Sequence, residues 1–220
     1  MSTNDLPNDA PATNLFPQFN DQLYQMISVE VQDLTDAQLD FESDRWEWSK
    51  WSIRRNLSHM ASGDFRWFWT RWGEELFPEG LANSREIEAL LDSPYDRRLD
   101  ESKFWALDDI LGMLRKGLDF AWSVLSSETV GSMRRKEIES ADGELWSGIR
   151  QANYTGIRLK PNHLGRIYIS LEATFRHRYF EHITHLYNVQ RLKRAQGLAP
   201  VADIPMEGYL ALPTWDLSQP

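Results

Sequence analysis

The sequence of 220 residues contains no cysteine. A disulfide framework, a thiolate nucleophile and a cysteine zinc site are therefore excluded, and any sulfur chemistry needs a sulfur atom from a substrate. The first residues, MSTNDLPNDAPATN, have neither the basic region nor the apolar region of a signal peptide. Together these features predict a cytoplasmic protein.

Long apolar runs are also missing, since no stretch approaches the roughly 20 residues that span a bilayer. The net charge of −9 disfavours binding to nucleic acid or to anionic lipid, because both need a basic face. The sequence has no glycine-rich phosphate loop, no nucleophile elbow and no dinucleotide fingerprint. We expect no membrane partner, no nucleic-acid partner and, for an enzyme, a small-molecule substrate.

What the chain does have is helical periodicity. Hydrophobic residues make up 41% of the chain, and they recur at helical spacing in four segments: 16–34, 52–76, 106–125 and 162–195. Ser52 is a suitable N-cap, Gly197 is a suitable helix terminator, and residues 84–91 predict a short extra helix. Residues 126–161 are irregular, although Asp142-Gly143 is typical of a hairpin turn.

The predicted fold class is therefore all-α, a four-helix bundle with an irregular segment before the last helix. The predicted layout is a disordered tail over residues 1–14, a bundle domain over 15–197, and an extended tail over 198–220 that packs on the bundle.

Ten tryptophans are concentrated partly in two stretches, residues 46–51 and 66–72. One interpretation is an aromatic pocket in which Arg66 or Arg71 binds an anionic substrate. The favoured interpretation is core packing with cation–π contacts. Exposed tryptophans and the apolar tail together predict a homodimer through helix faces.

Three of the five histidines, His177, His182 and His185, are crowded in the last predicted helix. Relative to Leu171 at the centre of its apolar stripe, His182 lies at about 20°, His185 at about 40°, Glu181 at about 80° and His177 at about 120°. His182 and His185 therefore point inward one turn apart, which is the spacing of two metal ligands on one helix. The alternative is a pair of hydrogen-bonded core histidines.

A further ligand has to come from another helix, and His59 is the one histidine of the second segment. It lies roughly 160–200° from the Leu57 stripe, which places it in solvent on a helix with a single apolar face. Gly63 and Trp67 lie on its flank, however, so the segment is apolar on more than one side. His163 is interpreted as a surface residue at a helix start.

Three segments resemble the DinB-like superfamily, which includes damage-inducible DinB proteins and bacillithiol- and mycothiol-dependent transferases. WSKWSIRRNLSHM at 48–60 is similar to the opening of that family's second helix, with its Trp-Ser and its later Leu-x-His. THLYNVQRLKR at 184–194 resembles its last-helix signature, and DLTDAQLDF at 33–41 resembles its exit from helix one. The three segments occur in the family's order.

The resemblance implies a four-helix bundle in which three histidines hold a divalent metal, zinc, nickel or iron. His59 and His185 match two of those positions, and the third falls on Glu181, where the family usually has histidine. Three alternatives follow: Glu181 is the ligand, the adjacent His182 replaces it at spacing i, i+3, or the site is degenerate. An intact site implies a thiol transferase or hydrolase with a low-molecular-weight thiol as co-substrate, and a degenerate one implies a non-catalytic binding or stress-response module.

Overall fold

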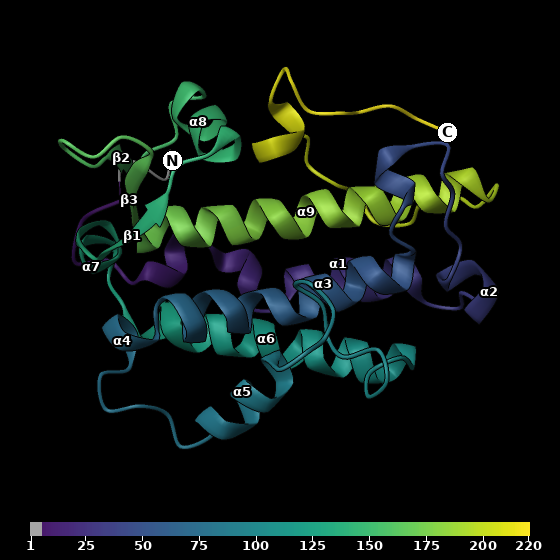
Figure 1. The fold of residues 1–220 in the computed structure, drawn as a ribbon, viewed down its shortest axis with the longest axis horizontal. Coiled ribbons are helices and arrows are strands. Elements are labelled where there is room, and N and C mark those ends of the chain that lie inside the picture. The colour runs from purple at the N-terminus through teal and green to yellow at the C-terminus, as the bar shows by residue number, and fades with distance from the viewer. Residues whose placement is uncertain (1–5) are drawn as a thin grey trace.

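The computed structural model describes residues 6–220, which are mostly helical with one small antiparallel sheet (Figure 1). Within these residues, no helix combines the length and the apolarity needed to cross a bilayer. The helical class predicted from periodicity is confirmed in outline. The small sheet is a feature that the sequence-based prediction did not include.

Four helices form the body of the protein: α1 (Gln22–Val31), α3 (Ile53–Phe65), α6 (Leu107–Ser127) and α9 (Leu171–Ala195). Helix α3 packs against both α6 and α9, and α1 also contacts both of them. Figure 1 shows α9 running lengthwise across the molecule, with α3 and α6 below it and α8 above it. This arrangement brings the middle of α3 against the middle of α9, where the predicted site residues lie.

Five shorter helices occupy the connections between the long ones. They are α2 (Asp36–Leu39), α4 (Gly73–Leu76), α5 (Ser84–Leu91), α7 (Val130–Arg135) and α8 (Glu144–Gln151). Helix α5 has the bounds that the sequence predicts. Between α3 and α4 the chain continues as a π-helical segment, Arg66–Arg71, so the second predicted helix is almost continuous but changes its winding.

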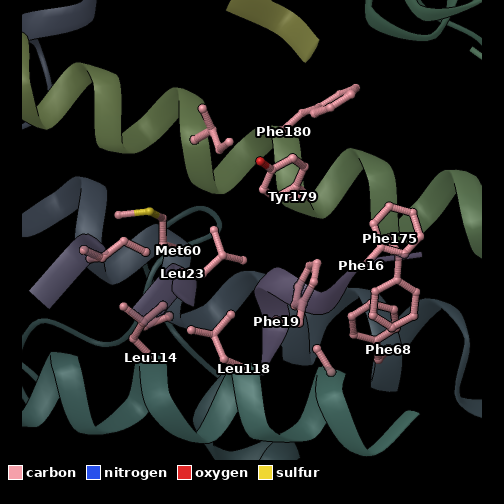
Figure 2. Close-up of a cluster of buried hydrophobic side chains, with 14 of the residues drawn as sticks. Phe16, Phe19, Leu23, Met60, Phe68, Leu114, Leu118, Phe175, Tyr179 and Phe180 are labelled. Atoms are coloured by element: carbon pink, nitrogen blue, oxygen red, sulfur yellow. The ribbon is translucent and has the colours of Figure 1, made fainter. Parts of the chain in front are cut away.

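Aromatic side chains from distant parts of the chain fill the centre of the core (Figure 2). The rings of Phe68 and Phe175 stack with centroids 4.4 Å apart, and Phe19 meets Phe175 edge-on at 5.3 Å. Leu114 and Leu118 of α6 close the core from the other side (Figure 2). Burying one such side chain contributes about 1.5–3 kcal/mol, so these contacts supply much of the stability of the fold.

The sheet has the strand order β1 (Glu137–Ala141), β3 (Arg166–Ser170), β2 (Ile157–Leu159). Strands β1 and β2 lie in the segment predicted to be irregular, whereas β3 lies in the predicted last helix. Asp142-Gly143 is not a hairpin turn, because β1 pairs with the distant β3 and Gly143 leads directly into α8. The hairpin instead joins β2 to β3, with Asn162 at a positive φ of 60° in its loop.

The predicted start of the last helix at residue 162 is therefore wrong. Ile167 and Ile169 are buried on one face of β3, which is the alternation of a strand. The predicted helix start rests on Leu164, Ile167 and Leu171, which follow helical spacing at i, i+3 and i+7. Helix α9 begins only after Ser170, whose hydroxyl accepts from the Ala173 amide and caps the helix. Leu164, which lies within the predicted helix, is fully exposed.

The sequence predicts a disordered tail over residues 1–14, but residues 6–14 pack against the rest of the protein. Ala12 is buried in a turn of 3-10 helix, and its amide donates to the Glu128 carbonyl at 3.1 Å. Pro11 forms a bridge with Thr129, so this segment is held at the end of α6. Residues 1–5 of the predicted tail lie outside the described residues.

The C-terminal tail over residues 198–220 packs against α9, with Tyr209 and Leu210 buried in the turn Gly208–Ala211. Its path is fixed by Glu30 of α1, a fully buried carboxylate. That carboxylate accepts hydrogen bonds from four groups: Lys193 Nζ, Gln190 Nε2, and the amides of Val201 and Ala202. Burial opposes ionisation of Glu30, but these hydrogen bonds outweigh it and lower the pKa of the carboxyl.

Replacing this carboxylate tests its role in the fold. Glu30→Gln is expected to lower the free energy of unfolding by about 3–5 kcal/mol, because it leaves the ammonium of Lys193 buried without a counter-charge. Glu75→Gln, at an exposed position of α4, is the control and is expected to change it by less than about 0.5 kcal/mol. Urea denaturation at pH 7 measures both, and equal losses would contradict the assignment.

The same pair predicts a pH dependence. The folded-state pKa of Glu30 lies below its ordinary 4.5, so its stabilisation is present above that value and is lost as the pH falls through the folded-state pKa. The difference in unfolding free energy between wild type and Glu30→Gln should therefore shrink on acidification below about pH 4. A difference that stays constant between pH 7 and pH 3 would exclude this linkage.

Candidate metal centre

Helices α3 and α9 bring three side chains together. Ser52 caps α3 by accepting from the Arg55 amide, and this start places His59 two turns into the helix, facing α9. On α9, Glu181 and His185 are spaced i, i+4 and so lie on one face. Among residues 6–220 the one group of histidine and acidic residues with metal-site spacing is His59, Glu181 and His185, whose ligand atoms all lie within 4.8 Å of one another.

The distances show that the cluster converges on one carboxylate oxygen. Nε2 of His59 is 3.5 Å from Oε2 of Glu181, and Nε2 of His185 is 3.7 Å from the same oxygen. The two imidazole rings have centroids 4.5 Å apart. His59 is buried, while Glu181 and His185 are partly buried, so the cluster lies at the edge of the core.

Acceptors behind the two histidines determine which ring nitrogen carries the proton. Nδ1 of His59 is 2.9 Å from the Arg97 carbonyl oxygen, which can only accept. Nδ1 of His185 is 2.8 Å from Oδ1 of Asn56, and the amide nitrogen of Asn56 donates to the Trp51 and Ser52 carbonyls. Both histidines therefore carry their proton on Nδ1 and present the Nε2 lone pair to Glu181.

The charges of the cluster follow from its burial. Burial lowers the pKa of His59 to about 4, and the neighbouring His185 lowers it further, so His59 is neutral at pH 7. Burial opposes ionisation of Glu181, but hydrogen bonds from His185 and His59, which each ring donates from Nε2 when it is protonated, outweigh it and lower the pKa of Glu181 well below the ordinary value. When both rings are neutral, two nitrogen lone pairs and a carboxylate face one another, and a cation would stabilise this arrangement.

His182 lies outside this group. Its Nε2 is 3.0 Å from Oδ2 of Asp64, whose Oδ1 accepts from Nε of Arg178 at 2.8 Å. All three side chains are almost fully buried between α3 and α9. Burial opposes ionisation of Asp64, but His182 and Arg178 together lower its pKa. His182 points into the core, as the sequence predicts. It contacts Asp64 there and is not part of the group formed by His59, Glu181 and His185.

His177 lies one turn before Glu181, and the sequence places it about 120° from the centre of the apolar stripe. In the structure it is buried: its Nδ1 forms a hydrogen bond with the Tyr209 hydroxyl, and its ring packs between Trp67 and Trp146. Burial lowers the pKa of His177 to about 3. The i, i+4 spacing from Glu181 is the sequence signal that could have placed His177 on the site face.

His163 is exposed in the β2–β3 loop, so it is a surface residue but not at a helix start.

A cavity of about 390 Å³ opens beside the cluster, with His59 and Glu181 in its wall. Arg178 also lines it, and its guanidinium crosses from α9 to α3 directly over Gly63. A Cβ at Gly63 would lie 2.2 Å from Nη2 of Arg178, so only glycine leaves room for the arginine there. Sequence reasoning gave no signal for Arg97 or Asn56, because their roles depend on contacts between distant segments.

No protein-family model, no curated protein and no solved structure matches this chain.

The close approach at Gly63 can be tested by adding one methyl group. Gly63→Ala is expected to cost about 1–3 kcal/mol of unfolding free energy, because the methyl forces Arg178 away from Asp64. Gly112→Ala is the matched control in the middle of α6, where a Cβ meets nothing within 4 Å, and it should stabilise the protein by about 0.5–1 kcal/mol. Urea denaturation measures both, and stabilisation by both variants would contradict the packing of Arg178.

Proposed function

We propose that this chain binds one divalent metal ion through Nε2 of His59, a carboxylate oxygen of Glu181 and Nε2 of His185, and uses it on a small-molecule substrate. The convergence of these three donors, with both Nδ1 atoms held by acceptors, is the observation that supports the proposal. Two imidazoles and a carboxylate are a donor set that suits zinc, iron or nickel. The order of the segments and the packing of α1, α3, α6 and α9 favour a DinB-like four-helix bundle.

The reaction class follows from the number of ligands and from the cavity. Three protein ligands are typical of catalytic sites that keep a position for substrate or water, and the neighbouring cavity would supply access. A metal bound here would lower the pKa of a bound thiol or water and so supply a nucleophile near neutral pH. The chain has no cysteine, so a low-molecular-weight thiol would be the sulfur source of a thiol transferase.

One observation favours a second candidate, a non-catalytic helical binding or stress-response module. Glu181 stands where the DinB-like pattern usually has histidine, and its carboxylate also fits a role as an acceptor between two buried imidazoles.

The homodimer stays a prediction, but the exposed tryptophans on which it is partly based are few. Of the ten tryptophans, only Trp105 is exposed by more than a third.

Metal content distinguishes the two candidates. Protein purified without a histidine tag and titrated with zinc is expected to take up one ion per chain. His59→Ala and Glu181→Gln should each abolish tight binding, and Asn56→Ala, which removes the acceptor behind His185, should weaken it about 10–100-fold. His163→Ala is the control and should bind as wild type does. A wild type that binds no zinc, nickel or iron would favour the non-catalytic module.

The proposed thiol chemistry has its own spectroscopic test. Cobalt(II) replaces zinc in many sites, and a thiolate bound to it produces a charge-transfer absorption band in the near ultraviolet. Because the chain contains no cysteine, such a band can come only from an added thiol. Adding a low-molecular-weight thiol to cobalt-loaded protein should produce the band, and Glu181→Gln should abolish it. A loaded protein without a band would exclude the transferase and leave the hydrolase.

A further inference from the structure

The cavity beside the metal centre has a wall whose composition the metal does not explain. It lies between the end of α3, the connection that carries Arg97, helix α8, and helix α9. Its volume of about 390 Å³ is that of a metabolite-binding site. Arginine and tryptophan side chains line it in addition to the cluster residues His59 and Glu181.

The π-helical segment determines which side chains reach this cavity. The Trp72 amide donates to the Trp67 carbonyl five residues earlier, at 3.1 Å, which is the hydrogen bond of a π turn. On a regular α-helix, Arg71 would lie about 120° from His59. A π turn advances roughly 80° per residue, so five residues of it rotate Arg71 back by roughly 100°. The segment therefore adds Arg71 to the face that already carries His59 and Arg66.

Within the described part of the chain, two arginines of the cavity make only one hydrogen bond each: Nη2 of Arg66 donates to the Arg98 carbonyl at 3.4 Å, and Nη2 of the exposed Arg71 donates to Oγ of Ser140 at 2.6 Å. Over residues 6–220, neither Arg66 nor Arg71 has a carboxylate within ion-pair distance, and Asp96 acts on Arg66 only at longer range. Nε of Arg66 is buried without a partner, and so is Nη2 of Arg178, a residue only 2% exposed. In a chain with nine more acidic than basic side chains, two arginines without carboxylate partners indicate a ligand that supplies the negative charge.

Arg54 shows how the same protein neutralises a buried arginine when no ligand is involved. Its guanidinium is almost fully buried and bonds to Asp36 and Asp40, at 2.6 and 2.5 Å. A third nitrogen contact is to the Trp105 carbonyl. Two carboxylates thus neutralise Arg54, whereas no carboxylate of residues 6–220 lies within ion-pair distance of Arg66 or Arg71.

Part of the cavity wall is aromatic. Trp67 and Trp146 meet edge to face with ring centroids 6.0 Å apart, and both line the cavity. The guanidinium of Arg71 lies over the Trp67 ring at 4.1 Å, which fixes the side chain at the boundary between the charged and the aromatic parts. Indole faces bind flat apolar groups, and guanidinium groups bind oxyanions through paired hydrogen bonds.

We propose that the cavity binds a small organic oxyanion, a carboxylate or a phosphate ester with a flat apolar body. The guanidinium groups of Arg66 and Arg71 bind the anion, and the indoles of Trp67 and Trp146 contact the body. This assignment names a substrate class for the proposed metal site. The reaction of this substrate rests on the proposed function. Binding of the anion does not, because it needs only the residues of the cavity wall.

Isothermal titration calorimetry with model compounds tests the proposal. Zinc-treated wild type is titrated with benzoate, phenyl phosphate and benzamide, which share the ring and differ in charge. Benzoate or phenyl phosphate should bind at one site per chain, and the stronger of the two identifies the anion. Neutral benzamide should bind at least about tenfold more weakly, because it lacks the charge-assisted hydrogen bonds. Equal binding of all three compounds, or no binding of either anion, overturns the proposal.

Variants then locate the anion. Arg66→Gln and Arg71→Gln should each weaken binding of the anion about tenfold or more, and Arg71→Lys should lose less because it keeps the charge. Arg45→Gln is the matched control, since Arg45 also lies over a tryptophan ring, that of Trp46, but is outside the cavity. It should bind as wild type does, and each variant's thermal unfolding shows whether the fold is intact.

The zinc-free protein separates this proposal from the proposed function. Anion binding that persists in zinc-free protein and in His59→Ala, and that falls in the arginine variants, supports the assignment whether or not zinc binds. Anion binding that needs zinc and is unchanged in the arginine variants means that the anion coordinates the metal. That result overturns this inference and leaves the metal site standing.

Discussion

The buried ion pair between Asp64 of α3 and Arg178 of α9 is the contact on which the candidate site depends. Both side chains are at most 2% exposed, and His182 forms a hydrogen bond with the second carboxylate oxygen of Asp64. Breaking such a pair leaves an uncompensated buried charge, so α9 cannot rotate about its axis without a large loss of stability. That fixed rotation points Glu181 at His59. It also directs His182 into the core.

Around this contact, parts of the chain with no regular structure complete the site. The Arg97 carbonyl comes from the connection between α5 and α6, and it orients the imidazole of His59. Tyr209 comes from the C-terminal tail and forms a hydrogen bond with His177 at the far side of the cavity. The tail itself is held by Glu30 of α1. Stability and site geometry are thus coupled, because the same buried carboxylates that join the helices also position the segments around the cavity.

The charge distribution of the protein is informative because it is uneven. The chain is acidic overall, yet the cavity wall has arginines that no described carboxylate pairs. The change from α- to π-winding after α3 adds Arg71 to that wall and also stacks it on Trp67. The tryptophan-rich stretch over residues 66–72 therefore contributes both to the core and to the cavity wall. Trp72 is fully buried in the core, whereas Trp67 faces the cavity.

The sequence by itself determined the long helices α3 and α6, whose apolar stripes are uninterrupted, and it named His59, Glu181 and His185 among the site candidates. Three features were decided only by the tertiary structure. The choice of Glu181 over His182 depends on the rotation of α9, since adjacent residues on a helix differ by about 100° and a stripe estimate cannot locate a partner such as Asp64. The sheet depends on pairing of β3 with β1, which lies about 30 residues earlier in the chain, and local periodicity carries no information on that pairing. The oriented imidazoles depend on a backbone carbonyl, a group that every residue has and that becomes specific only when the chain folds.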